Sequence, residues 1–308
     1  MMKLPAMDVV LSSVVDVFQR TVDGFQKTES RSRYATVAAV VVSYGAFSLY
    51  RYVTKRNRRR KWEDVPKDVV LVHALPKGRL APNVSPFVLK LETYLRLAKI
   101  PYQLDFDEPL GPKGKSPWVT WNGEDIADSQ VIIERLGRHY GKDFTSKLTA
   151  EQQAAARSLT LMVTEHLCWG LRVWRHELDQ GRAVIQSMAN VPLYMRLGMP
   201  LFRWKIMRDL RVQGMGKHSP EEVGDMVKKD LAAISLYLGE KPFLMGKEPS
   251  EVDCTVFGFL AQLKWNYPGS PYETMLEADF PNLTGFVLRM KERLWPDWDR
   301  CLDYPETL

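Results

Sequence analysis

The chain has 308 residues, of which 45% are hydrophobic and 26% charged, so most of it can build a folded core and a wholly disordered chain is excluded. Its formal net charge of +6 is uneven, because residues 51–61 hold seven basic residues and no acidic one, whereas residues 1–50 carry +1 and the remainder −2. The positive charge therefore belongs to one short cluster, and nucleic-acid binding by the folded part is not supported.

Residues 1–33 form the first segment. Val10, Leu11, Val14 and Phe18 follow helical spacing, and aspartates lie on the other side, which predicts an amphipathic helix. Aspartates within the apolar run argue against a signal peptide. Such a helix could lie on a membrane surface, pack on a partner or remain a weakly ordered surface helix, and the sequence leaves these alternatives open.

Residues 34–53 predict a transmembrane helix. Residues 34–50 carry no charge, and at about 1.5 Å per residue they reach roughly 25 Å, near the lower limit for a bilayer core of about 30 Å. Tyr34, Tyr50 and Tyr52 lie at the ends, where aromatic residues favour the membrane interface. The alternative is a buried helix or an uncleaved targeting segment.

The segment at 54–67 is a basic juxtamembrane linker by its composition. The positive-inside rule places such a cluster, and the larger part of the chain after it, in the cytosol. We therefore expect a single-pass membrane protein with a cytosolic folded part. The sequence does not distinguish the endoplasmic reticulum from the outer mitochondrial membrane.

Residues 68–143 predict a small α/β domain. The expected order is a buried strand at 68–75, a helix that begins at Ser85-Pro86, a second strand at 100–106, a hairpin and a final helix that begins at Asp128-Ser129. The hairpin is indicated by Asn122-Gly123 between strands at 118–121 and 125–127. A right-handed crossover makes the first two strands parallel neighbours, so the domain should be a thioredoxin-like layer.

Residues 148–302 predict an all-helical domain. Thr149, Ser219 and Ser250 each open a capping-box pattern, with a glutamine, glutamate or aspartate three residues later. The stretch at 189–216, with Pro192 and Pro200, predicts an interrupted helix and suggests a surface for a partner.

The cysteines and histidines of the chain do not form a metal motif. The chain has three cysteines, Cys168, Cys254 and Cys301. Because the number is odd and the residues are far apart in the sequence, we expect reduced thiols in the cytosol. His166, Cys168 and His176 lack the spacing and the fourth ligand of a zinc site, so no metal is expected.

The stretch Gly114-Lys115-Ser116-Pro117, followed by the hairpin and by Asp128-Ser129, resembles the glutathione-binding half of glutathione transferases. The resemblance implies that Ser116 and Pro117, the latter preceded by a cis peptide bond, align the tripeptide, and Lys115 could assist a carboxylate. It also implies that Asp128 and Ser129 hold the γ-glutamyl group. A simpler interpretation is that Asp128 only caps the helix and that Pro117 only ends a loop.

Ser85 is the candidate catalytic residue. A hydroxyl at a helix start can donate to the sulfur of glutathione, and the helix dipole lowers the pKa of a thiol there. Its position resembles the activating serine or cysteine of several glutathione-transferase classes. The alternative is that Ser85 is only the N-cap. Residues 85 and 88 are not cysteines, which excludes a Cys-x-x-Cys redox centre.

Three stretches together, residues 85–96, 250–262 and Trp295-Pro-Asp-Trp298, closely resemble the failed axon connections family, which is related to metaxins. Val88 departs from the family pattern, which has a cysteine there. The resemblance implies an N-terminal membrane span, a thioredoxin-like domain and a glutathione-transferase-like helical domain. It also implies roles in axon development or, as in metaxins, in mitochondrial import.

Two functional hypotheses follow. The first is a membrane-anchored binding or adaptor protein that holds a protein partner or forms a homodimer. The second is a glutathione transferase or peroxidase that activates the thiolate with Ser85. A third possibility is a protein that senses glutathione by binding it without turnover. No cofactor is expected, and glutathione would be a ligand or co-substrate.

Overall fold

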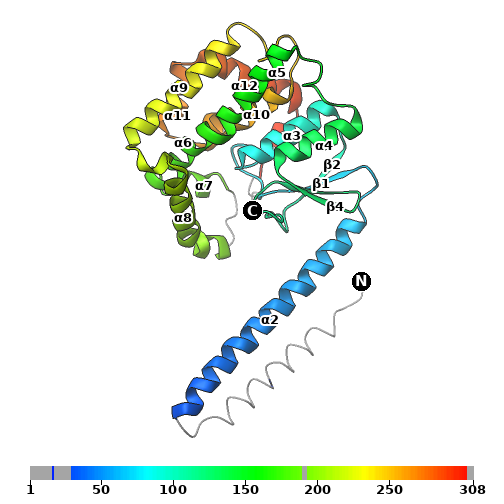
Figure 1. Ribbon diagram of the computed structural model, residues 1–308, viewed down its shortest axis with the longest axis vertical. Coiled ribbons are helices and arrows are strands. Elements are labelled where there is room, and N and C mark those ends of the chain that lie inside the picture. The colour runs from blue at the N-terminus through cyan, green and yellow to red at the C-terminus, as the bar shows by residue number, and fades with distance from the viewer. Residues whose placement is uncertain (1–15, 17–28, 189–192, 304–308) are drawn as a thin grey trace. The chain divides into compact units, whose positions relative to one another are not determined.

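The computed structural model describes Asp16, residues 29–188 and residues 193–303 (Figure 1). The chain divides into two compact units, Met1–Val65 and Pro66–Leu308. The amphipathic helix predicted for residues 1–33 lies outside the described residues, apart from Asp16 and the stretch from residue 29 onward.

One long helix, α2 (Glu29–Glu63), accounts for the described part of the first unit after Asp16. Its segment Val37–Glu63 is long and apolar enough to cross a membrane, as judged by length and composition. Side chains such as Val40, Val41 and Tyr44 are exposed. The apolar helix is where the sequence predicts it, and it continues through most of the basic segment at 54–67.

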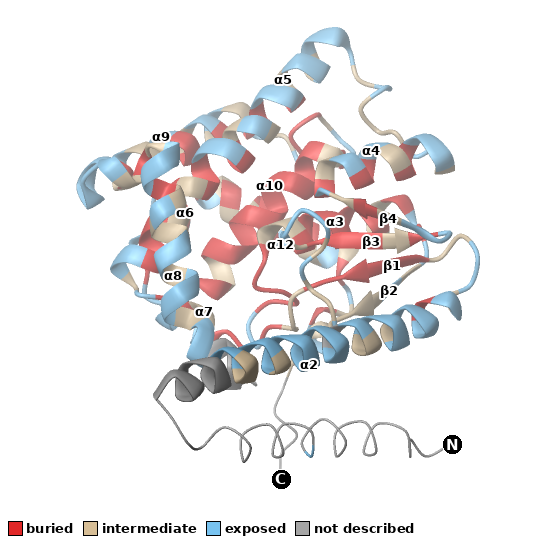
Figure 2. Ribbon diagram, turned by 60° about the horizontal axis from the view of Figure 1, so that its bottom comes forward, coloured by how far each residue is buried: buried red, intermediate tan, exposed pale blue. Residues whose placement is uncertain are grey.

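The second unit begins with a four-stranded sheet in the order β2-β1-β3-β4. Strand β1 pairs in parallel with β2 and antiparallel with β3, and β3 pairs antiparallel with β4. Helices α3 (Pro86–Ala98) and α4 (Ser129–Tyr140) lie together over one face of the sheet (Figure 2). The strands are β1 (Val70–His73), β2 (Tyr102–Asp105), β3 (Trp118–Trp121) and β4 (Glu124–Ala127).

Local sequence explains the turns and helix ends of this domain. Asn122 and Gly123 both adopt positive φ, 49° and 83°, which is the backbone of the tight hairpin that the sequence predicts. Ser85 caps α3 and Pro86 occupies the first helical position. The predicted parallel neighbours, the hairpin and both helix starts are confirmed, and the domain is thioredoxin-like.

The rest of the second unit is helical, as predicted. Met162–Leu167, Trp174–Leu178 and Gln262–Asn266 are π-helical, and Met215–Lys217 and Trp298–Cys301 are short 3₁₀ turns. The capping boxes at Thr149, Ser219 and Ser250 are present. The α-helices are α5 (Ala150–Leu161), α6 (Cys168–Val173), α7 (Arg182–Gln186), α8 (Leu193–Gln213), α9 (Pro220–Leu238), α10 (Glu251–Ala261), α11 (Pro271–Ala278) and α12 (Pro281–Leu294).

Helix α8 differs from its prediction. The sequence predicts an interrupted helix over 189–216, with Pro192 and Pro200. Pro192 lies outside the described residues, and at Pro200 there is no interruption, because the helix runs from Leu193 to Gln213. A proline removes one helical hydrogen bond and frees a carbonyl group. Pro200 is exposed, so water can solvate what the proline leaves unpaired.

Helix α10 is the centre of the packing between the two domains. All of the α10 residues from Val252 to Ala261 are buried. The helix lies directly against α3. Gly258 permits this contact, because a Cβ atom there would lie 2.6 Å from the carbonyl oxygen of Pro86 and 2.9 Å from the amide nitrogen of Lys90. The start of α3 is therefore fixed by backbone contact with the helical domain.

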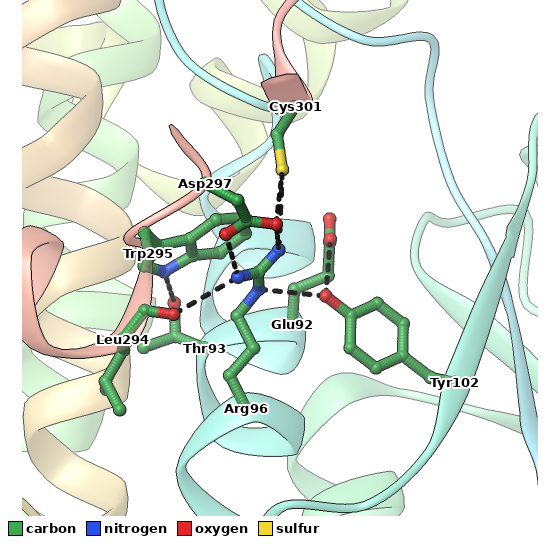
Figure 3. A network of polar contacts seen from close by, with 8 residues as sticks. All are labelled: Glu92, Thr93, Arg96, Tyr102, Leu294, Trp295, Asp297 and Cys301. Atoms are coloured by element: carbon green, nitrogen blue, oxygen red, sulfur yellow. Dashed lines mark hydrogen bonds and ion pairs between the residues drawn. The ribbon is translucent and has the colours of Figure 1, made fainter. Parts of the chain in front are cut away.

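A second connection between the domains is the polar network around Arg96 (Figure 3). The guanidinium group of Arg96 makes two bonds to the Asp297 carboxylate, at 2.5 and 3.1 Å, and lies 3.9 Å from the ring centre of Trp295. The indole nitrogen of Trp295 donates to the Thr93 hydroxyl at 3.1 Å. Since Arg96 and Thr93 belong to α3, these contacts tie that helix to the C-terminal end of the described chain.

Glu92 gives this network a pH dependence. Burial raises the pKa of Glu92 to about 7 against the attraction of Arg96 and a hydrogen bond from Tyr102. The folded protein therefore keeps a proton between about pH 4.5 and 7 that the unfolded chain has released. The free energy of unfolding should therefore fall by up to about 3 kcal/mol as pH rises through this window. Above the window, Glu92 should make no further change to it.

We expect Glu92→Gln to remove most of this dependence, because glutamine fills the same space and does not ionise. The measurement is denaturant unfolding of the full chain in mild detergent at pH 5 and pH 8, followed by tryptophan fluorescence. Exposed Glu240 supplies the control, as Glu240→Gln should leave the dependence unchanged. A Glu92→Gln protein with the pH dependence of the wild type would contradict the prediction.

Candidate functional site

The register of the sheet brings the predicted site residues to one edge. His73 at the end of β1 pairs with Trp118 at the start of β3, and Trp118 pairs with Ala127 at the end of β4. Ser116-Pro117 directly precede that row, and Asp128-Ser129 directly follow it. Helix α4 starts at this edge, and the loop that leads to α3 leaves from it.

Ser85 lies at the beginning of α3 and is buried. Its hydroxyl oxygen accepts a long 3.4 Å bond from the amide of Val88, and its own amide donates to the side-chain oxygen of Asn83 at 3.0 Å. Asn83 in turn donates to the carbonyl of Leu75 at 2.6 Å, just beyond β1. These contacts hold the serine hydroxyl at the end of the sheet, where Ser116 and Asp128 also lie.

The loop before Ser85 is held from the other side by side chains of the helical domain. Gln262 and Asn266 both donate to the carbonyl of Asn83, at 3.1 and 3.2 Å. Arg175 donates to the carbonyl of Val84 at 3.2 Å, is 9% exposed and has a buried Nε atom without a partner among the described residues. Its guanidinium carbon lies 4.4 Å from the ring centre of Tyr267.

Arg175 is the residue that sequence reasoning missed. It follows a tryptophan in an apolar helical run, and no motif signals it. Only the fold brings its guanidinium group to the carbonyl of Val84, the residue before Ser85. A cation there favours a thiolate over a thiol, as does the start of α3.

Other positive charges surround the same region. Burial raises the pKa of the Cys168 thiol, whereas Arg172, Arg175 and Lys115 act to lower it. Burial, Arg175 and Arg172 lower the pKa of His176 to about 3. Lys115, from the loop before β3, and the two arginines of the helical domain thus act on the same thiol, whereas Glu165 acts to raise its pKa.

The loop before β3 carries the next predicted residues. Lys115 is exposed, Ser116 is half-buried and Pro117 is buried, and the peptide bond between Ser116 and Pro117 is cis. The hydroxyl oxygen of Ser116 is buried and has no hydrogen-bond partner within the part of the chain that the structure describes.

Asp128 has an unusual backbone for a residue other than glycine, with φ 90° and ψ 118°. Its Oδ1 atom accepts hydrogen bonds from the amides of Gln130 and Val131, at 2.9 and 3.3 Å, so it caps α4. The residue is exposed, and both hydrogen bonds that its carboxylate accepts from the described part of the chain go to Oδ1. A strained conformation that presents a carboxylate is typical of a binding site.

Lys90 lies behind this helix start and was not singled out in the sequence. It is 1% exposed, and its ammonium group donates to the side-chain oxygen of Gln130 at 2.8 Å. Burial lowers the pKa of Lys90 to about 8, although Asp128 acts to raise it. Ser129 beside them is buried. Lys90 thus joins α3 to the first turn of α4.

The two tryptophans of the hairpin are held within the domain. The indole of Trp118 stacks on His73, with ring centres 3.7 Å apart, and donates to the carbonyl of Glu108 at 2.8 Å. The indole of Trp121 donates to the Tyr140 hydroxyl at 3.2 Å. Their positions are thus fixed by contacts of the sheet. Within the described residues, no three His, Cys, Asp or Glu side chains gather as a metal site would require.

Two family models match the chain. The model of the glutathione S-transferase N-terminal domain matches residues 86–180, and that of the glutathione S-transferase C-terminal domain matches residues 227–290.

Three curated relatives are similar to the chain. Failed axon connections of Drosophila melanogaster is 35% identical over 76% of this chain, which spans 60% of that protein's length. The isoprene-epoxide–glutathione S-transferase of a Rhodococcus strain is 30% identical, and the match covers 69% of this chain and 93% of the enzyme. Metaxin-2 of Mus musculus is 21% identical over 77% of this chain and 93% of its own length.

A solved structure shares the fold. It is a glutathione S-transferase of Methylobacterium radiotolerans in complex with glutathione sulfonate, and it superimposes with a TM-score of 0.51. The match covers 78% of this chain and 97% of that enzyme, at 16% sequence identity.

Proposed function

Because the chain belongs to the metaxin-like, failed axon connections family of the glutathione S-transferase superfamily, we propose that it is a membrane-anchored binding protein that takes glutathione at the edge of its sheet. Glutathione is a ligand here, and the protein serves as an adaptor in the membrane. The two parts of the proposal rest on separate observations and are tested separately.

The register of the sheet carries the glutathione part. It places Ser116 and Pro117 opposite Asp128 and Ser129, as the antiparallel pairing of Trp118 with Ala127 requires. A γ-glutamyl group has an ammonium and a carboxylate. Asp128 Oδ2 suits the first, and the amides at the start of α4 with the Ser129 hydroxyl suit the second. We assign exposed Lys115, from the loop before β3, to the other carboxylate of the tripeptide.

The anchor part rests on α2. An exposed apolar helix long enough for a bilayer precedes a strongly basic segment. By the positive-inside rule the second unit then faces the cytosol, where glutathione is abundant and thiols are reduced. The metaxin-like relationship favours a binding role over turnover. A second argument for binding is Val88, which stands where the family pattern has a cysteine, so this chain lacks a thiol at that position.

The experiment is a calorimetric titration of the full chain in detergent micelles with glutathione. We expect binding with a Kd between micromolar and low millimolar. No heat and no thermal shift at several millimolar glutathione would overturn the glutathione part. Alkaline carbonate extraction of cell membranes tests the anchor, because an integral protein stays in the membrane pellet and a peripheral one is released.

Ser85 and Arg175 favour a second candidate function, glutathione conjugation. The serine hydroxyl lies at a helix start, and the buried guanidinium group of Arg175 bonds to the carbonyl of the preceding residue, Val84. A helix start and a nearby cation both favour a thiolate. Attack of that thiolate on an electrophile would be the reaction. An epoxide is the electrophile to test first, because the Rhodococcus relative is by name an isoprene-epoxide–glutathione S-transferase.

If conjugation occurs, Ser85→Ala should lower kcat/KM for an epoxide about 100-fold, because one donor to the developing thiolate is lost. The Kd for glutathione should change less than about threefold. Ser85→Thr keeps both the hydroxyl and the N-cap and is the matched control. The measurement is conjugate formation across pH 6–9. An unchanged rate in Ser85→Ala would remove the serine from the reaction.

A further inference from the structure

Helix α8 carries an apolar stripe on the face that points away from the protein. Leu197, Leu201 and Trp204 follow the i, i+4, i+7 spacing of one helix face. They are 73%, 70% and 61% exposed, although such residues are usually placed against a core. On the opposite face, Leu210 is fully buried, so the helix is docked on the domain, and no described residue covers its outer stripe.

The same outer face is basic. Lys205, Arg208 and Arg211 are exposed and continue the stripe toward the C-terminal end of α8. The whole helix holds five basic residues and one acidic residue, Asp209, which lies 3.4 Å from Arg208. The guanidinium group of Arg208 also lies 5.6 Å from the ring centre of Trp204. Leucine, tryptophan and positive charge on one face are the composition of a helix that lies in a membrane interface.

We propose that α8 is a second membrane contact, which lies in the interface of an anionic bilayer with Leu197, Leu201 and Trp204 among the acyl chains. The charge of its outer face matches phosphatidylserine or other acidic headgroups and would repel a basic protein surface. The folded unit also stays close to the bilayer that holds the anchor, because only the residues between Glu63 and Val70 separate the anchor helix from the first strand.

The consequence is that the folded unit is held against the bilayer by two contacts. The anchor provides attachment, and α8 restricts orientation, so that one side of the unit always faces the lipid. This inference rests on the anchor proposed above only in part, since an interfacial helix binds acidic lipid by itself, more weakly and in a salt-dependent way.

The test uses the full chain in vesicles of phosphatidylcholine with about 30% phosphatidylserine, which gives the bilayer a negative surface charge. Leu201→Cys is labelled with an environment-sensitive fluorophore, and nitroxide-labelled acyl chains serve as the quencher. The control is Leu236→Cys, which is exposed at the far end of α9. The unsubstituted chain corrects for labelling of its own cysteines.

We expect a blue-shifted emission and strong lipid quenching at position 201 and neither at position 236. In the triple variant Lys205→Gln, Arg208→Gln and Arg211→Gln, the affinity of α8 for the vesicle surface, measured by lipid quenching at low salt, should fall about tenfold or more. It should then differ little between low and high salt.

Two results would overturn the inference. The first is a label at position 201 that stays as solvent-exposed as the one at position 236, in a chain that resists carbonate extraction. This result would support the membrane anchor and contradict the α8 contact. The second is a blue shift without lipid quenching, with energy transfer between labelled copies, which means that a second copy covers the stripe. Release of the chain by carbonate, with quenching that salt abolishes, would remove the anchor and leave the α8 contact intact.

Discussion

Asp128→Asn is expected to reduce the affinity for glutathione by about 10- to 100-fold without unfolding the protein. The substitution keeps the size of the side chain and an oxygen that caps α4, but it removes the negative charge. A charge-assisted hydrogen bond to an ammonium group contributes about 1.5–3 kcal/mol, which is the basis of this range. Glutathione titration of the full chain at constant pH measures the change.

Two further variants separate binding from capping. Asp128→Ala loses the cap as well as the charge and should cost an additional ~1 kcal/mol of stability. Asp128→Gly relieves the positive φ of 90°, so its folded state should be less strained while its affinity is lost. If Asp128→Asn binds glutathione as the wild type does, the carboxylate is only a helix cap, and the assignment of the γ-glutamyl group fails.

Gly258→Ala is expected to destabilise the folded unit by about 3 kcal/mol or more. The added Cβ would lie 2.6 Å from the Pro86 carbonyl oxygen and 2.9 Å from the Lys90 amide nitrogen. Both are backbone atoms of α3, so neither can move aside by a change of rotamer, and α3 must separate from α10. Denaturant unfolding followed by fluorescence measures the loss.

The matched control is Gly224→Ala in α9, where the added Cβ has nothing within 4 Å. Alanine is favoured over glycine inside a helix by up to about 1 kcal/mol, so this variant should be neutral or more stable. Since α3 also presents Ser85, surviving Gly258→Ala protein should bind glutathione more weakly than the wild type. Equal stability of the two variants would show that α3 and α10 are not in close contact.

Several features follow from neighbouring residues and were therefore predictable. Ser85-Pro86 begins a helix because the hydroxyl caps it and proline suits its first turn, and Asn122-Gly123 forms the hairpin because both residues tolerate positive φ. The helix at 34–53 was predictable because residues 34–50 form an uncharged, mostly apolar run. Pro200 shows the limit of such reasoning, because its effect on α8 depends on whether water reaches the freed carbonyl.

The sequence by itself determined the order of the strands and helices, the thioredoxin-like and helical domains and the apolar N-terminal helix. These depend on capping, turn residues and hydrophobic spacing, which act over a few residues. Only the tertiary structure decided that Arg175 bonds to the carbonyl of Val84 beside Ser85, that Lys90 bonds to Gln130, that Gly258 permits contact with α3, and that the outer stripe of α8 is exposed. Each of these depends on segments far apart in the chain, whose approach is set by the packing of the whole core.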